Sequence, residues 1–109
     1  MSQRVAKMES LIQQVVATTI RDLLQHDAAW VTVTRVDAAP DLRQATVWLG
    51  LLGTEAQQTV LIDRLQGARS LIMRALAGKL TTKFAPQLHL RADGGGAYAA
   101  EIDRLLKNL

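Results

Sequence analysis

Residues 66–92 are the part of the sequence whose residue types could bind a charged ligand. This stretch contains no carboxylate and five fixed positive charges: Arg69, Arg74, Lys79, Lys83 and Arg91. The chain has a formal net charge of +3, so the residues outside this stretch carry −2, with eight basic residues against ten acidic ones. Basic residues gathered in one segment are typical of a phosphate-binding surface. A solvated helix face is the alternative, and the lack of interspersed acids favours polyanion binding.

Arg4 and Lys7 are two more candidate phosphate-binding residues, near the start of the chain. They lie beside the apolar stripe of a helix predicted over residues 4–25. The stripe repeats at steps of three and four, as in a helix that packs on a core, and consists of Val5, Met8, Ile12, Val15, Val16, Thr19, Ile20 and Leu23. A membrane-surface helix is the alternative, but the polar side is not densely basic and no aromatic residue anchors it.

Residues 30–36 and 43–52 are predicted to be strands, because β-branched and alternating apolar residues dominate both segments. The valines of the first segment fall out of alternation before Val36, which predicts a bulge near Thr34 or Arg35. One face of the second segment carries Ala45, Val47, Leu49 and Leu51. The connection between the segments is short, so an antiparallel hairpin is the simplest pairing.

A second helical run is predicted after Thr54, whose hydroxyl can cap its N-terminus. Its apolar positions are Val60, Leu61, Leu65, Ala68, Leu71, Ile72, Ala75 and Leu76. Glycine inside a helix costs about 1 kcal/mol relative to alanine, so the mid-run sequence with Gly67, Ala68 and Ser70 predicts a kink or break between two helices. A third strand over residues 87–92 and an amphipathic helix over residues 97–109 complete the order.

Residues 1–109 are therefore predicted to form a single α+β domain, with a three-stranded sheet packed on helices. This length is close to the commonest domain size. The chain has no cysteine, which excludes disulfides and thiolate metal sites. No apolar run approaches the ~20 residues that span a bilayer, and the start of the chain lacks the apolar core of a signal peptide. We expect a soluble, cytoplasmic protein without a membrane partner.

A catalytic site is not predicted. His26 and His89 lack a local partner at metal-ligand spacing. The carboxylates form no paired motif, and no glycine-rich loop matches a phosphate-binding pattern. We expect a protein that is not an enzyme and that has no metal, no cofactor and no small-molecule substrate.

The predicted order α-β-β-α-α-β, followed by a C-terminal helix, is that of a type II KH domain, an RNA-binding module. Such a domain normally has a GxxG loop between its two central helices. At that junction this chain has Gly67, Ala68, Arg69 and Ser70. The prediction is a type II KH-like domain without the GxxG loop.

Five segments together resemble the ribosome-binding factor A family. They are Arg4-Val5 at the start of the first helix, residues 31–37 (VTVTRVD), residues 40–47 (PDLRQATV), a helix-to-strand pattern from Leu76 to Asp93, and residues 102–106 (IDRLL). Three departures are visible. Ala68-Arg69-Ser70 replaces the family's Ala-x-Gly kink, residues 26–29 replace its Asp-Pro-Arg connection, and Glu101 stands where the family tends to have arginine.

The resemblance implies a non-enzymatic factor that binds the free small (30S) ribosomal subunit near the 5′ end of its 16S rRNA. It also implies a role in late 16S rRNA maturation, including 5′-end processing, and absence from translating 70S ribosomes. We expect a monomer. The alternative is a small protein-interaction or dimerisation module without RNA binding, which would use the apolar part of the second strand: Trp48, Leu51 and Leu52.

Overall fold

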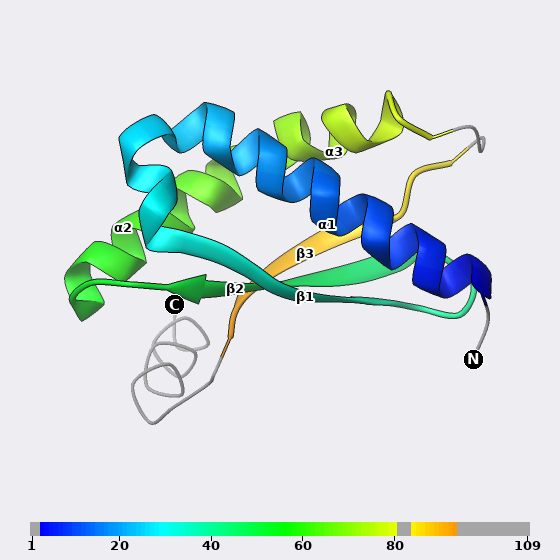
Figure 1. Cartoon of the computed structure of the whole chain (residues 1–109), viewed down its shortest axis with the longest axis horizontal. Helices are drawn as coiled ribbons and strands as arrows, with labels where there is room; N and C mark the ends of the chain where they lie inside the picture. The colour runs from blue at the N-terminus through cyan, green and yellow to red at the C-terminus, as the bar shows by residue number, and fades with distance from the viewer. Residues whose placement is uncertain (1–2, 81–83, 94–109) are drawn as a thin grey trace.

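The computed structural model describes residues 3–80 and 84–93, which form an α+β fold. The elements in chain order are α1 (Gln3–Leu24), the 3-10 helix η1 (Gln25–Trp30), β1 (Val31–Ala38), β2 (Gln44–Leu51), α2 (Glu55–Gly67), α3 (Arg69–Ala77) and β3 (Gln87–Ala92). Figure 1 shows the three α-helices on one side of the sheet. The final helix predicted over residues 97–109, together with Glu101 and Lys83, lies outside the described residues.

The sheet has the strand order β1-β2-β3. β1 and β2 pair antiparallel, which confirms the predicted hairpin. The register shifts between Val33 and Arg35, which confirms the predicted bulge and allows both Val31 and Val36 to be buried. β3 runs parallel to β2, because the two helices α2 and α3 carry the chain back to the start of the sheet.

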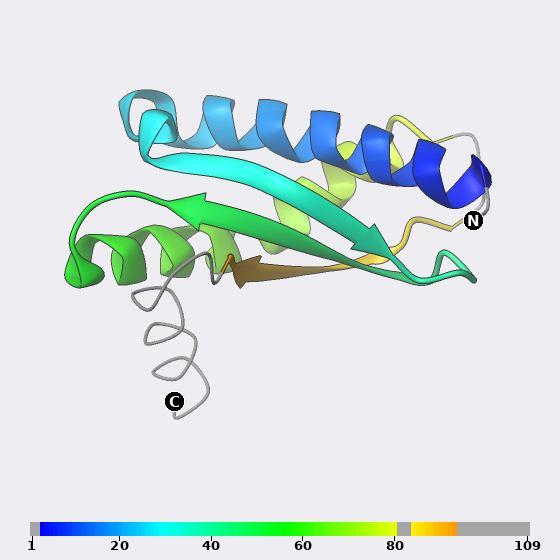
Figure 2. The same cartoon turned by 60° about the horizontal axis from the view of Figure 1, so that its bottom comes forward.

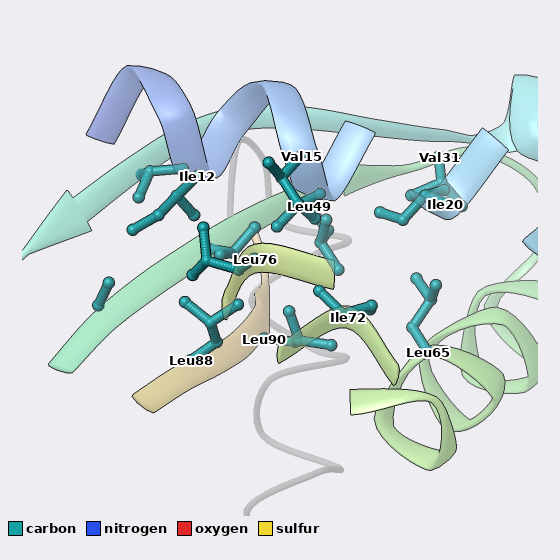
Figure 3. Close-up of a cluster of buried hydrophobic side chains, with 14 of the residues drawn as sticks. Ile12, Val15, Ile20, Val31, Leu49, Leu65, Ile72, Leu76, Leu88 and Leu90 are labelled. Atoms are coloured by element: carbon teal, nitrogen blue, oxygen red, sulfur yellow. The ribbon is translucent and has the colours of Figure 1, made fainter. Parts of the chain in front are cut away.

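The core lies between the helices and the inner face of the sheet. Figure 3 shows Leu76 of α3 between Ile12 of α1 and Leu88 of β3, and all three side chains are fully buried. Alternation along β2 and β3 supplies the inner face, as predicted. The predicted packing of Val60 and Leu71 is wrong, since these side chains are 59% and 45% exposed. The helical run breaks before Leu71, so one continuous stripe does not extend across both helices.

The start of α2 has a complete capping box. The Thr54 hydroxyl accepts a hydrogen bond from the backbone N–H of Gln57 at 3.2 Å. In return, the Gln57 side-chain oxygen accepts one from the Thr54 backbone N–H at 2.8 Å. These two bonds satisfy amide groups that a helix N-terminus otherwise leaves unpaired. The predicted role of Thr54 is confirmed.

The second helical run divides at Ala68, between Gly67 at the end of α2 and Arg69 at the start of α3. Ala68 has φ −98° and ψ 7°, outside the helical range. Its backbone N–H is shared between the carbonyl oxygens of Arg64 and Leu65, both at 3.1 Å. This bifurcated bond tightens the last turn of α2 and lets α3 start in a new direction.

The sequence does contain one GxxG string, residues 50–53, but it leads out of β2 and does not join the two helices. Its second glycine, Gly53, has φ +99°. A Cβ placed there would lie 2.6 Å from the Gln57 side-chain oxygen and 3.1 Å from the Trp30 ring. This glycine is therefore required by the backbone geometry of the turn before α2.

Gly67→Ala is expected to raise the free energy of unfolding by about 0.4–1 kcal/mol. Gly67 is in the last turn of α2, and a Cβ added to it would meet no atom within 4 Å. Gly53→Ala is the matched control and is expected to lower the free energy of unfolding, because a positive φ and two close atoms oppose the methyl group. Urea unfolding measures both. A destabilised Gly67→Ala variant would show that the end of α2 needs glycine.

Candidate nucleic-acid interface

The structure brings three of the predicted cations together at one end of the molecule. Arg4 and Lys7 from the start of α1 and Lys79 from the segment after α3 line one shallow hollow of about 340 Å³. Met8, Leu11, Leu42 and Leu80 form its apolar part. We call Arg4, Lys7 and Lys79 the basic end. All three side chains are exposed, so the basic end can reach an external anion.

The two cations within α3 occupy different positions. Arg74 is exposed, because Ile72 and Leu76 turn the opposite side of the helix into the core. Arg69, at the first residue of α3, is only partly exposed. Arg74 therefore adds to the charge on the outer surface of the helices, whereas Arg69 marks the break between α2 and α3.

Lys7, Arg69, Arg74 and Lys79 form no ion pair with a carboxylate within the described part of the chain. The ion pairs between described residues involve other arginines: Arg35 with Asp37 at 3.3 Å and Arg64 with Asp27 at 2.8 Å. Cations that form no ion pair contribute a positive potential that attracts phosphate.

Helix stability does not account for two of these cations. Arg4 lies in the first turn of α1 and Arg69 begins α3, and neither first turn contains an acidic residue. A helix dipole disfavours a cation at its N-terminus by about 0.3–1 kcal/mol. Neither arginine therefore stabilises its own helix through the helix dipole.

Arg91 does not share the surface of these helices. Leu88, Leu90 and Ala92 of β3 are buried, so the alternation of the strand directs Arg91 to the opposite face of the sheet. Its register partner on β2 is Trp48. Arg91 therefore lies on a different face from the other predicted cations of residues 66–92 that the structure describes, and its RNA contact stays a prediction.

The dimerisation alternative predicted an apolar contact surface on the second strand, and one of its residues, Trp48, lies on this outer face of the sheet. Trp48 donates its indole N–H to the Asp37 carboxylate at 2.9 Å, and the Arg35 guanidinium lies 4.8 Å from the centre of the indole ring. Leu51 belongs to the other side of β2 and is half-buried. Leu52 is 60% exposed. The three predicted contact residues therefore do not form one apolar patch.

Arg43 is a basic residue that was predicted only as part of the second strand. It lies just before β2 and lines a second hollow together with Arg4 and Phe84. The sequence signal that could have identified Arg43 as a candidate is a basic residue next to a tight turn. Its neighbours in space come from residues about forty positions away on either side, which no local pattern reveals.

Metal-ligating clusters and membrane-spanning helices are two further kinds of feature that can indicate function. Within residues 3–80 and 84–93, no three histidine or carboxylate side chains come together as they would around a metal ion. None of the helices described for this chain has the length and apolar character needed to cross a membrane.

Several known proteins with similar sequences carry the same family name. The family model of ribosome-binding factor A matches residues 4–106. Ribosome-binding factor A of Thermomicrobium roseum is 34% identical over 109 residues, which cover 99% of this chain and 84% of that protein. The protein of the same name from Methylobacterium nodulans is 40% identical over 78 residues, which cover 72% of this chain and 57% of that protein.

Solved structures agree with this similarity. The solution NMR structure of a candidate ribosome-binding factor A from Thermotoga maritima aligns with a TM-score of 0.69 at 27% identity, over 87% of this chain and 92% of that chain. The crystal structure of ribosome-binding factor A from Thermus thermophilus aligns with a TM-score of 0.70 at 20% identity, over 84% of this chain and 98% of that chain. At 20% identity the second likeness shows the fold alone.

Proposed function

The chain belongs to the ribosome-binding factor A family, and on this premise we propose that it binds the free small (30S) ribosomal subunit. Binding uses the phosphates of 16S rRNA. The bound protein holds a local rRNA arrangement until late maturation, including 5′-end processing by nucleases, is complete. It acts in the cytoplasm as a monomer, without a catalytic step or cofactor of its own.

The basic end is the observation that carries the proposal. Arg4, Lys7 and Lys79 meet although more than seventy residues separate the first from the last. Lys7 and Lys79 are exposed and have no described carboxylate partner. Phosphate contacts of this kind fix the position of a protein on a nucleic acid without reading its sequence. A rigid rRNA surface, which presents many phosphates in fixed positions, is suited to contacts of this kind.

The fold supports a type II KH-like domain as the framework of this interface. The described order α1-β1-β2-α2-α3-β3 agrees with that class. Where a KH domain has its GxxG loop, Ala68 and Arg69 carry side chains between α2 and α3. The backbone of a single strand is held less closely at such a junction than at glycines. The junction between α2 and α3 is therefore not a clamp on a short single strand, and binding relies on a broad cationic surface.

The affinity for 30S subunits is expected to fall steeply with salt. If Arg4, Lys7, Arg69, Arg74 and Lys79 each neutralise one phosphate, the logarithm of the binding constant against the logarithm of salt concentration has a slope of about −3.5 to −4.5, depending on whether the RNA is single- or double-stranded. Titration of labelled protein with 30S subunits at several salt concentrations measures this slope. A slope near zero would exclude the electrostatic mechanism.

Two glutamine variants provide the control for this titration. Lys79→Gln removes one cation of the basic end and is expected to make the slope shallower by about 0.7–0.9. Arg91→Gln removes the same charge from the opposite face of the sheet and is expected to leave the slope unchanged. Equal effects of the two variants would show that the interface is not confined to the helical side.

A further inference from the structure

A hollow of about 490 Å³ lies where the first turns of α1, the β1–β2 turn and the segment leading into β3 meet. Figures 1 and 2 both show these three segments at the same end of the molecule. The hollow is lined by Arg4, Met8, Asp41, Leu42, Arg43, Phe84 and Ala85. Its volume is within the range of about 300–1,000 Å³ that is typical of sites for small organic groups.

Phe84 is the aromatic residue of this hollow. Its side chain is 81% exposed, more than any other large apolar side chain among the described residues. A phenyl ring with that exposure contributes little to the core. An aromatic face on a basic surface is instead suited to stacking with a nucleobase, whatever the identity of the base. Met8 and Leu42 extend the apolar lining beside it.

The charge around Phe84 suits a phosphate. Arg4 and Arg43 line the same hollow, and Arg4 also lines the neighbouring hollow of the basic end. Asp41 is the one carboxylate among the lining residues, and its Oδ1 already accepts a hydrogen bond from the Arg43 backbone N–H at 3.0 Å. Positive charge therefore predominates here.

The wall of the hollow that contains Leu42 is a fixed turn. Leu42 has φ +59°, a conformation that leucine rarely adopts. Its backbone N–H donates to the Ala39 carbonyl at 2.9 Å, and the Ala39 N–H donates to the Gln44 carbonyl at 2.8 Å. Unusual backbone conformations of this kind persist where the surrounding structure enforces them and cluster at binding sites. The turn holds Leu42 and Arg43 beside Phe84.

We propose that this hollow binds one unpaired nucleotide of RNA, with its base stacked on Phe84 and its phosphate against Arg4 and Arg43. The inference rests on the proposed function and adds to it: the interface holds a looped-out or single-stranded nucleotide in addition to phosphates. Bases inside an RNA duplex are already stacked and cannot occupy such a position, so the bound nucleotide is unpaired.

Three substitutions at one position test the proposal, with purified 30S subunits as the probe. Phe84→Ala and Phe84→Leu are both expected to weaken binding about fivefold or more, the lower limit for losing one base–aromatic stack. Phe84→Tyr keeps an aromatic face and is expected to bind like wild type. Because Phe84 is so exposed, all three variants are expected to keep the wild-type melting temperature, which is the control for folding.

The pattern across the variants identifies the ligand. If Phe84→Leu binds normally while Phe84→Ala does not, the residue contacts an apolar part of a ribosomal protein, and the inference is overturned. Normal binding by all the variants overturns it as well. In both cases wild-type binding to 30S subunits leaves the proposed function intact. Wild-type protein that bound no subunit would overturn the proposed function, and this inference with it.

A photocrosslink gives a direct readout. A benzophenone amino acid placed at position 84 of the full chain is expected to crosslink to 16S rRNA when the complex with the 30S subunit is irradiated. A crosslink confined to a ribosomal protein would overturn the inference even if the affinities followed the expected pattern.

Discussion

Leu76→Ala is expected to lower the free energy of unfolding by about 2–5 kcal/mol. Leu76 is fully buried, and Figure 3 shows it between α1 and β3. Truncation removes apolar contacts to both layers and leaves a cavity that the surrounding elements cannot fill completely. Domains of this size have a total stability of about 5–15 kcal/mol, so this one change removes a large share. Urea unfolding followed by circular dichroism measures the loss.

Leu71→Ala is the matched control, because it is the same change in the same helix. Leu71 is 45% exposed, so the expected loss is no more than about 1 kcal/mol. Similar losses at Leu71 and Leu76 would contradict the orientation of α3 on which the positions of Arg74 and Lys79 depend.

The double variant Lys7→Glu/Lys79→Glu is expected to weaken binding to 30S subunits by at least about tenfold, which corresponds to 1.4 kcal/mol. Each change removes an attraction to phosphate and adds a repulsion. The two lysines converge on one hollow, so both charges act on the same part of the ligand. The fold is expected to survive, because both side chains are exposed. Co-sedimentation measures binding, and the melting temperature reports folding.

Arg21→Glu/Arg91→Glu is the control for net charge. It changes the charge of the chain by the same amount at two exposed positions away from the basic end. Arg21 lies toward the far end of α1, and Arg91 lies on the opposite face of the sheet. Binding near the wild-type level is expected. An equal loss in both double variants would mean that only the overall charge matters.

Local signals predicted most of the secondary structure because their causes are local. The out-of-phase Val36 indicated the bulge. Thr54 indicated the helix cap, whose hydrogen bond joins residues only three positions apart. The third strand was predicted within its observed bounds, Gln87–Ala92. The predicted boundaries of helices and strands differ from the observed ones where tertiary contacts determine them. Trp30, predicted to begin the first strand, instead ends η1.

The composition of the interface depended on tertiary structure and could be predicted only in part. The sequence placed Lys79 in a basic segment, but only the packing of α1 beside α3 brings Lys7 next to it. Arg91 was grouped with the helix cations because it is close in sequence, whereas strand alternation separates it from them. The hollow that Arg43 and Phe84 line together with Arg4 and Met8 of α1 is formed by three segments that are distant in sequence. No periodicity within a single segment encodes that arrangement.

Sedimentation of the tagged protein with separated 30S, 50S and 70S particles, at low and at high salt, tests 30S binding through phosphates most directly. We expect the protein to pellet with free 30S subunits at low salt, to leave them as salt is raised, and not to pellet with 50S or 70S particles. Equal recovery with 30S and 50S particles, or 30S binding that does not change with salt, would contradict specific 30S binding through phosphates.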